Sequence, residues 1–179
     1  MQFYLLDFYG LKRELPILSL GPKIKIASVN FLGDRELVNM AAKKLSEKIK
    51  DIEFDYLVGP EVTVLPLIHE LSNIFGHSRY VICRKGVKGY MVKPIKSDKE
   101  PSLVLNGIDA EMIRSKKVII VDDVVTSGKT IKTIKDLLLK VDSKIVMYLS
   151  IFKQGDGPIE GIDNFIYLQE IPVFNNFEK

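Results

Sequence analysis

The chain has 179 residues, of which 46% are hydrophobic and 27% are charged, and its formal net charge is +3. This composition is typical of a globular protein that buries a core without disulfides or metals, so we expect a single domain over residues 1–179. Dispersed basic residues and the lack of a long apolar run argue against a nucleic-acid-binding face and a membrane-spanning helix, and they favour a cytoplasmic protein.

The N-terminal part of the chain predicts short strands followed by a helix. Phe3–Phe8 is a short apolar segment, and a Lys-Arg-Glu turn is expected at 12–14. Ile17–Leu20 and Ile24–Val29 are typical of two short strands separated by a Gly-Pro turn. Asp34 can then cap a helix. The apolar face of that helix is formed by Leu37, Met40, Ala41, Leu45 and Ile49.

The next segment predicts a strand, a loop and a second helix. The apolar strand Tyr56–Val58 ends at Gly59-Pro60-Glu61. Apolar residues then recur at helical spacing from Val64 to Phe75, with Pro66 in the first turn and a glycine at the end. In such a unit the loop follows the strand, so residues 59–61 are expected at the C-terminal edge of a sheet, where α/β proteins bind ligands.

Basic residues follow another short strand, Tyr80–Cys83. Arg84, Lys85 and Lys88 are expected at the same sheet edge, where they can neutralise an anion, and a solvated turn is the alternative, above all for Lys85. Cys83 is the only cysteine, which excludes an internal disulfide, and its apolar surroundings are typical of a buried small hydrophobe. The polar stretch from Val92 to Met112 fits either a mobile active-site lid or a plain surface hairpin.

The most informative stretch runs from Val118 to Thr130. A β-branched apolar run, typical of a strand buried on both faces of a parallel sheet, ends in Asp122 and Asp123. A Thr-Ser-Gly loop and a helical pattern follow, so backbone N–H groups and the positive end of the helix dipole converge, which favours phosphate binding. Sugar hydroxyls or a divalent cation fit between a phosphate and two carboxylates. The pattern therefore indicates a ribose-5-phosphate site.

Two more strands are expected after this helix, at Lys144–Phe152 and, less regular, at Asn164–Leu168. Phe174 and Phe177 lie near the end of the chain. The alternation of strands and helices predicts an α/β fold with a mainly parallel central sheet and helices on both faces.

Residues 118–130 match the signature of the type I phosphoribosyltransferases: an apolar strand, two acidic residues, two apolar residues and a Thr/Ser/Gly loop. The chain resembles this family most clearly between Tyr56 and Phe152. Gly128-Lys129-Thr130 also looks like the end of a Walker A loop, but Asp123 occupies a position where that motif needs glycine, so the NTPase interpretation is rejected. The resemblance implies transfer of ribose 5-phosphate from phosphoribosyl pyrophosphate to a nucleobase, with release of pyrophosphate and with Mg²⁺ as cofactor.

The resemblance also assigns roles to residues. Asp122 and Asp123 are the implied catalytic residues, and they hold the ribose hydroxyls directly or through Mg²⁺. The implied ribose-5-phosphate site is Asp122, Asp123, Val125, Thr126, Ser127, Gly128, Lys129 and Thr130. The implied pyrophosphate site is Gly59, Pro60, Glu61, Arg84, Lys85 and Lys88. Around the core at 51–152, a small hood from residues 1–30 and 153–179 covers the base, a lid spans 86–104, and the candidate base contacts are Asn30, Phe31, Phe152 and Lys153.

The identity of the base is less clearly indicated. Gly59 and Glu61 resemble the Gly-x-Glu start of adenine and xanthine members, although adenine enzymes usually carry arginine where this chain has Thr63. Thr126 replaces the aspartate of hypoxanthine-guanine enzymes, and the basic segment beginning at Arg84 is closest to orotate members. A purine, adenine first, is therefore expected, with orotate as the alternative. A non-catalytic regulator that senses phosphoribosyl pyrophosphate is a further alternative. We expect a homodimer by resemblance, and no nucleic-acid or membrane partner.

Overall fold

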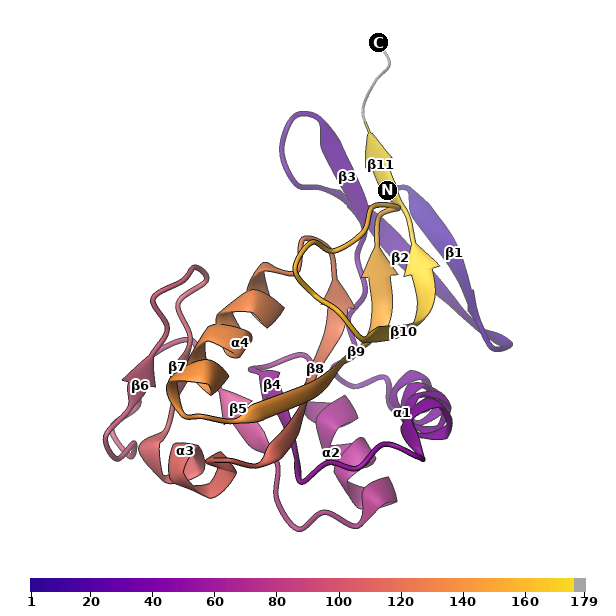
Figure 1. Cartoon of the computed structure of the whole chain (residues 1–179). Helices are drawn as coiled ribbons and strands as arrows, with labels where there is room; N and C mark the ends of the chain where they lie inside the picture. The colour runs from indigo at the N-terminus through magenta and orange to yellow at the C-terminus, as the bar shows by residue number, and fades with distance from the viewer. Residues whose placement is uncertain (176–179) are drawn as a thin grey trace.

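A parallel five-stranded sheet forms the centre of the computed structural model, which describes residues 1–175 (Figure 1). Its strands are β4 (Tyr56–Pro60), β5 (Val81–Cys83), β8 (Lys117–Val125), β9 (Lys144–Gln154) and β10 (Phe165–Ile171). They lie in the order β10-β9-β8-β4-β5, and each neighbouring pair is parallel. This sheet confirms the mainly parallel α/β fold that the apolar runs of the sequence predict.

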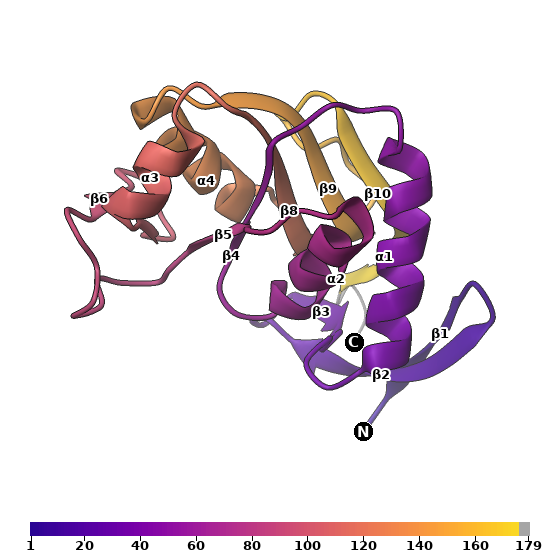
Figure 2. The ribbon, with the colours of Figure 1, turned by 90° about the horizontal axis from the view of Figure 1, so that it is seen from below.

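Helices cover both faces of this sheet. They are α1 (Arg35–Ile49), α2 (Leu65–Phe75), α3 (Gly107–Ile113) and α4 (Lys129–Lys140). α1 and α2 pack on one face, and α3 and α4 pack on the other (Figure 2). Residues of strand β8 pack against the helices on both faces of the sheet, because alternate residues of a strand point to opposite faces. Its Ile119 and Val121 pack toward α1 and α2, whereas its Val118 and Ile120 pack toward α3 and α4.

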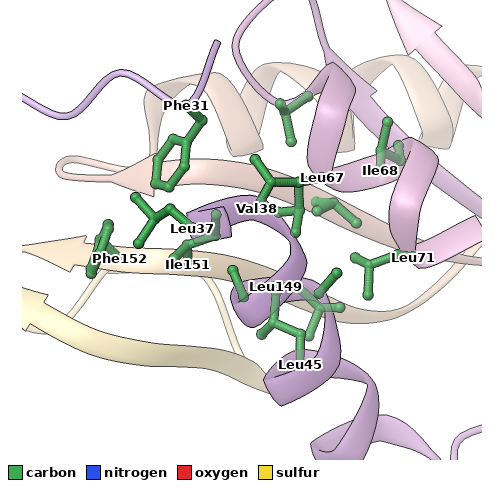
Figure 3. Packing of buried hydrophobic residues seen from close by; sticks show 14 of the residues in the cluster. Phe31, Leu37, Val38, Leu45, Leu67, Ile68, Leu71, Leu149, Ile151 and Phe152 are labelled. Atoms are coloured by element: carbon green, nitrogen blue, oxygen red, sulfur yellow. The ribbon is translucent and has the colours of Figure 1, made fainter. Parts of the chain in front are cut away.

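The larger core lies between the sheet and the helices α1 and α2 (Figure 3). The ends of these helices follow the sequence signals. Asp34 caps α1 by accepting a hydrogen bond from the Leu37 backbone N–H at 3.1 Å. Pro66 lies in the first turn of α2, and Gly76 ends that helix with a φ of +69°. The longest helix of residues 1–175, α1, has 15 residues, and no helix there is long and apolar enough to cross a membrane.

A second, antiparallel sheet joins the two ends of the chain (Figure 1). Its strands are β1 (Phe3–Phe8), β2 (Leu11–Ser19), β3 (Ile24–Ala27) and β11 (Val173–Asn175), in that order. The strands come from the segments predicted to form the hood. In this sheet Phe174 contacts Tyr4 edge to face, with ring centroids 6.4 Å apart, whereas Phe177 lies outside the described residues.

The turn predicted at residues 12–14 is wrong, because these residues lie inside β2. Their charges misled the interpretation: Lys12 and Glu14 are exposed, while Leu15 is buried, which is the alternation of a strand with one wet face. The chain instead turns at Tyr9 and Gly10, which both have positive φ values of 51° and 88°. A two-residue turn with two positive φ values joins antiparallel strands without splaying them.

The polar stretch after β5 contains more regular structure than a lid requires. β6 (Ile95–Lys96) and β7 (Val104–Leu105) form a small antiparallel hairpin, and α3 begins two residues later. The stretch at 92–112, which was predicted to be polar, therefore includes part of a helix, because α3 begins at Gly107 and buries Ala110 and Ile113 in the core. The hairpin is the alternative that the sequence left open, and closure of residues 86–104 over a ligand stays a prediction.

Candidate functional site

The loop between β8 and α4 encloses a small cavity of about 140 Å³ at the C-terminal edge of the sheet. Because α4 begins at Lys129, the unpaired N–H groups of its first turn and the positive end of its dipole face this loop. An anion such as phosphate is the ligand that this geometry favours. The cavity is lined by Asp122, Val124, Val125, Thr126, Ser127, Gly128, Lys129 and Thr130. Of the predicted ribose-5-phosphate residues, only Asp123 does not line it.

Gly128 shapes this loop through both its backbone and its missing side chain. Its φ is +69°, in the left-handed region that residues with a side chain rarely adopt. A Cβ atom here would lie 2.5 Å from Ile159 Cγ2 and 2.8 Å from Ile162 Cδ1, both too close for real atoms. Glycine therefore allows the loop to turn into α4 while it packs against the segment that follows β9.

The two carboxylates at the end of β8 lie in different surroundings. Asp122 is buried, with 7% of its surface exposed, whereas Asp123 is half-buried. Burial, followed by the charge of Asp123, raises the pKa of Asp122 well above its ordinary value. Asp122 Oδ1 accepts from the Asp123 N–H at 3.0 Å, and Asp123 Oδ1 accepts from the Val124 N–H at 2.9 Å. Asp122 thus lines the cavity, whereas Asp123 follows it on the strand and does not line it.

The end of β4 lies beside the strand that carries these carboxylates. A Cβ atom on Gly59 would approach the Val121 carbonyl oxygen to 2.8 Å, so only glycine lets β4 and β8 come this close. The loop that follows is tied to the neighbouring strand, because the Glu61 N–H donates to the Cys83 carbonyl at 2.9 Å. The fold therefore brings the loop at 59–61 and the basic segment after β5 to one edge, as the sequence predicts.

Glu61 organises the basic segment. Its Oε2 forms an ion pair with Arg84 Nε, and its Oε1 accepts from the Lys85 backbone N–H at 2.6 Å. Burial raises the pKa of Glu61, but the Lys85 hydrogen bond and the Arg84 and Lys88 charges outweigh it, so the pKa is lowered overall. Glu61 is therefore ionised at neutral pH and holds the basic residues in place, which leaves Lys85 and Lys88 as cations that an anion can approach.

The donor set near the cavity suits magnesium. Within residues 1–175, no three His, Cys, Asp or Glu side chains are arranged to hold a metal ion. Asp122 and Asp123 are therefore the acidic side chains of the chain that could hold a metal beside the cavity, together with substrate oxygens or water. Mg²⁺ is commonly bound in this way, through one or two carboxylates and phosphate oxygens, because it releases its waters reluctantly.

A comparison with known protein families shows to which family this chain belongs. Residues 32–178 match the model of the phosphoribosyl transferase domain. The chain belongs to this family.

Individual relatives and one solved structure show what this phosphoribosyl transferase domain is similar to. An adenine phosphoribosyltransferase of Halothermothrix orenii is 29% identical over 151 residues, which cover 78% of this chain and 85% of that protein. The transcriptional regulator GfcR of Methanococcus maripaludis is 30% identical over 128 residues, which cover 72% of this chain and 58% of that protein. The crystal structure of adenine phosphoribosyltransferase from Thermoanaerobacter pseudethanolicus shares the fold, with a TM-score of 0.70 at 20% identity over 87% of this chain and 95% of that chain.

The candidate base contacts of this phosphoribosyl transferase domain lie in two environments. Asn30 is exposed, and its Oδ1 accepts from the Leu32 N–H at 3.1 Å. Phe31 and Phe152 are fully buried, and their rings stack with centroids 5.8 Å apart (Figure 3). The two rings are therefore part of the core in this structure, because large apolar surfaces gain most from leaving water. Asn30 is the candidate whose side chain a base can reach without rearrangement.

Gln154 is a residue of the site that the sequence did not reveal. It ends β9 and has 5% of its surface exposed. Its Oε1 accepts from Thr126 Oγ1 at 3.3 Å, and its Nε2 donates to the Ala27 carbonyl at 2.9 Å. These partners lie 28 and 127 residues away, so no local pattern could indicate them. The preceding Lys153 is buried as well, and its ammonium pairs with Glu170 at 2.7 Å.

Proposed function

We propose that this protein is an Mg²⁺-dependent phosphoribosyltransferase that moves ribose 5-phosphate from phosphoribosyl pyrophosphate to a purine base, adenine first, in nucleotide salvage. One observation carries the proposal: the Asp122–Asp123 pair leads directly into the small cavity before α4, whose helix N-terminus favours an anion. The family of the chain and the adenine phosphoribosyltransferase among its relatives support the same activity.

The cavity would hold the 5′-phosphate of the donor. Backbone N–H groups at the start of α4 would donate to it, and Ser127 and Thr130 offer hydroxyls that can donate to phosphate oxygens, whereas the Thr126 hydroxyl donates to Gln154. The phosphate is remote from the carbon that reacts. Its binding energy can therefore be used to align that carbon with the attacking base.

The two aspartates act where charge develops. The bond from C1 of the ribose to the pyrophosphate oxygen breaks ahead of the new bond between C1 and a ring nitrogen of the base, which gives up its proton, so positive charge builds on the sugar. Asp122 and Asp123 would accept hydrogen bonds from the ribose hydroxyls and stabilise that charge from short range. The burial of Asp122 strengthens this effect, because few waters remain to screen the carboxylate.

The leaving group would be received on the other side of the carboxylates. Lys85 and Lys88 offer cations, and backbone N–H groups of the loop that begins at Gly59 would donate to the pyrophosphate oxygens. Glu61 keeps this segment folded through its bonds to Arg84 and Lys85. When bound, Mg²⁺ would neutralise pyrophosphate charge, with Asp122 and Asp123 as the residues able to hold it directly or through water.

A panel of bases tests the proposal. Pyrophosphate release is measured with phosphoribosyl pyrophosphate, Mg²⁺ and, one at a time, adenine, hypoxanthine, guanine, xanthine, orotate and uracil. We expect turnover with adenine above the others. Turnover with orotate alone would replace the purine by the pyrimidine alternative that Thr126 and the segment after Arg84 suggest.

A regulator is the second candidate, because a relative of comparable identity carries the name of a transcriptional regulator. This chain matches 58% of that protein, so the remainder of the regulator has no counterpart in the match. Tight binding of phosphoribosyl pyrophosphate without turnover on any base, together with a salt-dependent shift of operator DNA, would favour this candidate.

The assembly and location of the protein complete the proposal. We infer a homodimer, as resemblance to the family implies, and a cytoplasmic location, as the composition of the chain favours. Sedimentation at assay concentration tests the assembly, and a monomer there would contradict it.

A further inference from the structure

Gln154 connects two parts of the site that are far apart in the sequence. On one side, its Oε1 accepts from the hydroxyl of Thr126 in the phosphate loop at 3.3 Å. On the other side, its Nε2 donates at 2.9 Å to the carbonyl of Ala27, the last residue of β3. Three residues beyond Ala27 lies Asn30, the accessible candidate for base contact. One buried amide thus links the donor side of the site to its base side.

The chemistry of the partners fixes the direction of both hydrogen bonds. A backbone carbonyl can only accept, so the Ala27 oxygen must face the NH₂ group of the amide. The amide oxygen then faces Thr126, whose hydroxyl must donate. The bond therefore selects the rotamer of Thr126 that turns Oγ1 toward β9. Within residues 1–175, it is the only hydrogen bond made by a side chain of the loop at 126–130.

We propose that Gln154 is a positioning residue that sets the phosphate loop relative to the base-binding side of the site. The inference rests on the proposed function. Without the amide, the exposed Thr126 is free to adopt other rotamers, and the β3 carbonyl loses a partner, so both the donor and the base should bind more weakly. The chemical step should change little, because Gln154 touches neither Asp122 nor the reacting atoms.

The first test is Gln154→Leu, with Gln154→Met as a second variant that fills the same space. We expect the KM for phosphoribosyl pyrophosphate and the KM for the base each to rise about five-fold, with kcat within about two-fold, as loss of one net hydrogen bond predicts. The matched control is Ser143→Ala. This variant also loses a buried hydrogen bond to a backbone carbonyl, because Ser143 Oγ donates to the Ile113 carbonyl at 2.9 Å. Ser143 precedes β9 at the opposite edge of the sheet, so both KM values should stay unchanged.

A double-mutant cycle separates positioning from general stability. In a Thr126→Val background, Gln154→Leu should no longer raise the KM for phosphoribosyl pyrophosphate, because the hydroxyl is already gone, yet it should still raise the KM for the base. An equal rise in both backgrounds, or the same rise in Ser143→Ala, would overturn the inference.

Calorimetric titration with ribose 5-phosphate tests the role of Gln154 without requiring turnover. We expect Gln154→Leu to bind it about five-fold more weakly than the wild type. Equal affinity would overturn the positioning role and leave the proposed function intact. A wild-type protein that does not bind ribose 5-phosphate would overturn the proposed function itself.

Discussion

Asp122 carries its charge in surroundings that oppose it. Burial, and then the neighbouring carboxylate, raises its pKa well above the ordinary value. The folded chain therefore holds this proton more tightly than the unfolded chain, so the stability from Asp122 is full at low pH and is lost as the pH rises through the raised pKa. The fold therefore becomes less stable as the pH rises between the ordinary and the raised pKa, which is typical of a group retained for function.

Replacing Asp122 by asparagine should separate stability from activity. Asp122→Asn keeps the shape and the hydrogen bond from the Asp123 N–H while removing the charge. We expect a higher thermal midpoint at neutral pH, a gap to the wild type that shrinks toward acid pH, and pyrophosphate release lowered about 100-fold. Thermal melts across pH and steady-state rates measure these effects. A lower midpoint with an unchanged rate would assign Asp122 to structure instead.

Gly128 should be the least replaceable residue of the phosphate loop. Gly128→Ala forces a side chain into a left-handed backbone and against Ile159, so we expect a loss of about 1–3 kcal/mol in unfolding free energy and a higher KM for the donor. Gly157→Ala is the control, because nothing lies within 4 Å of its added Cβ. Denaturant titration and kinetics distinguish them, and equal behaviour of the two variants would contradict the account of this loop.

At the scale of elements, one ion pair anchors the second sheet to the core. Arg13 of β2 binds both oxygens of Asp34, with Nε to Oδ2 at 2.7 Å and Nη2 to Oδ1 at 2.9 Å, and Asp34 also caps α1. The Arg13 hydrogen bond, opposed by burial and aided by the Leu37 N–H, lowers the pKa of Asp34. This carboxylate therefore stabilises the fold above its unfolded pKa, and the contribution is lost as the pH falls through the lowered value.

Asp34→Ala should weaken the connection between β2 and the N-terminus of α1. We expect it to lower the unfolding free energy by about 1–2 kcal/mol at neutral pH, with a difference that shrinks as the pH falls from the ordinary pKa of aspartate through the lowered pKa of Asp34. Glu47→Ala serves as the control, since its pair with Lys44 is a more exposed contact within one helix and should contribute less than about 0.5 kcal/mol. Denaturant unfolding at the two pH values makes the comparison. A loss in Asp34→Ala no larger than in the control would contradict this role.

Elements with a strong local pattern could be predicted from the sequence. β8 and α4 are such a case, because an apolar run, a glycine loop and helical spacing each act over a few neighbouring residues. The strand containing Lys12 and Glu14 could not, because its charges lie on one wet face and resemble a turn. α3 was missed for a related reason: it is short, and only Ala110 and Ile113 of its residues are buried.

In the candidate site, too, the residues that are neighbours in sequence could be predicted, and those brought together by the fold could not. The loop at 126–130 and its aspartates are contiguous in sequence, so their chemistry is visible there. Gln154 is not, because its role depends on a partner 127 residues away. Phe31 and Phe152 were predicted as base contacts but are buried in the core. The sequence could not distinguish these two positions, because an aromatic residue near a site can face either a base or the core.

At the scale of the whole molecule, Cys83 reports on the integrity of the central sheet. It is fully buried in β5, and burial, with a smaller contribution from Asp109, raises its pKa to about 12. The thiol should therefore react with iodoacetamide only when the sheet opens. Labelling followed by mass spectrometry should be slow in the native protein and fast in denaturant. Rapid labelling of the native protein would contradict the packing of this edge.

The central claim is that the Asp122–Asp123 pair and its loop transfer a phosphoribosyl group. Pyrophosphate release with phosphoribosyl pyrophosphate, Mg²⁺ and adenine, measured side by side for the wild type and Asp123→Asn, tests it most directly. We expect adenine-dependent release by the wild type, a loss of about 100-fold in the variant and unchanged thermal unfolding. A variant as fast as the wild type, or a wild type without adenine-dependent release, would contradict it.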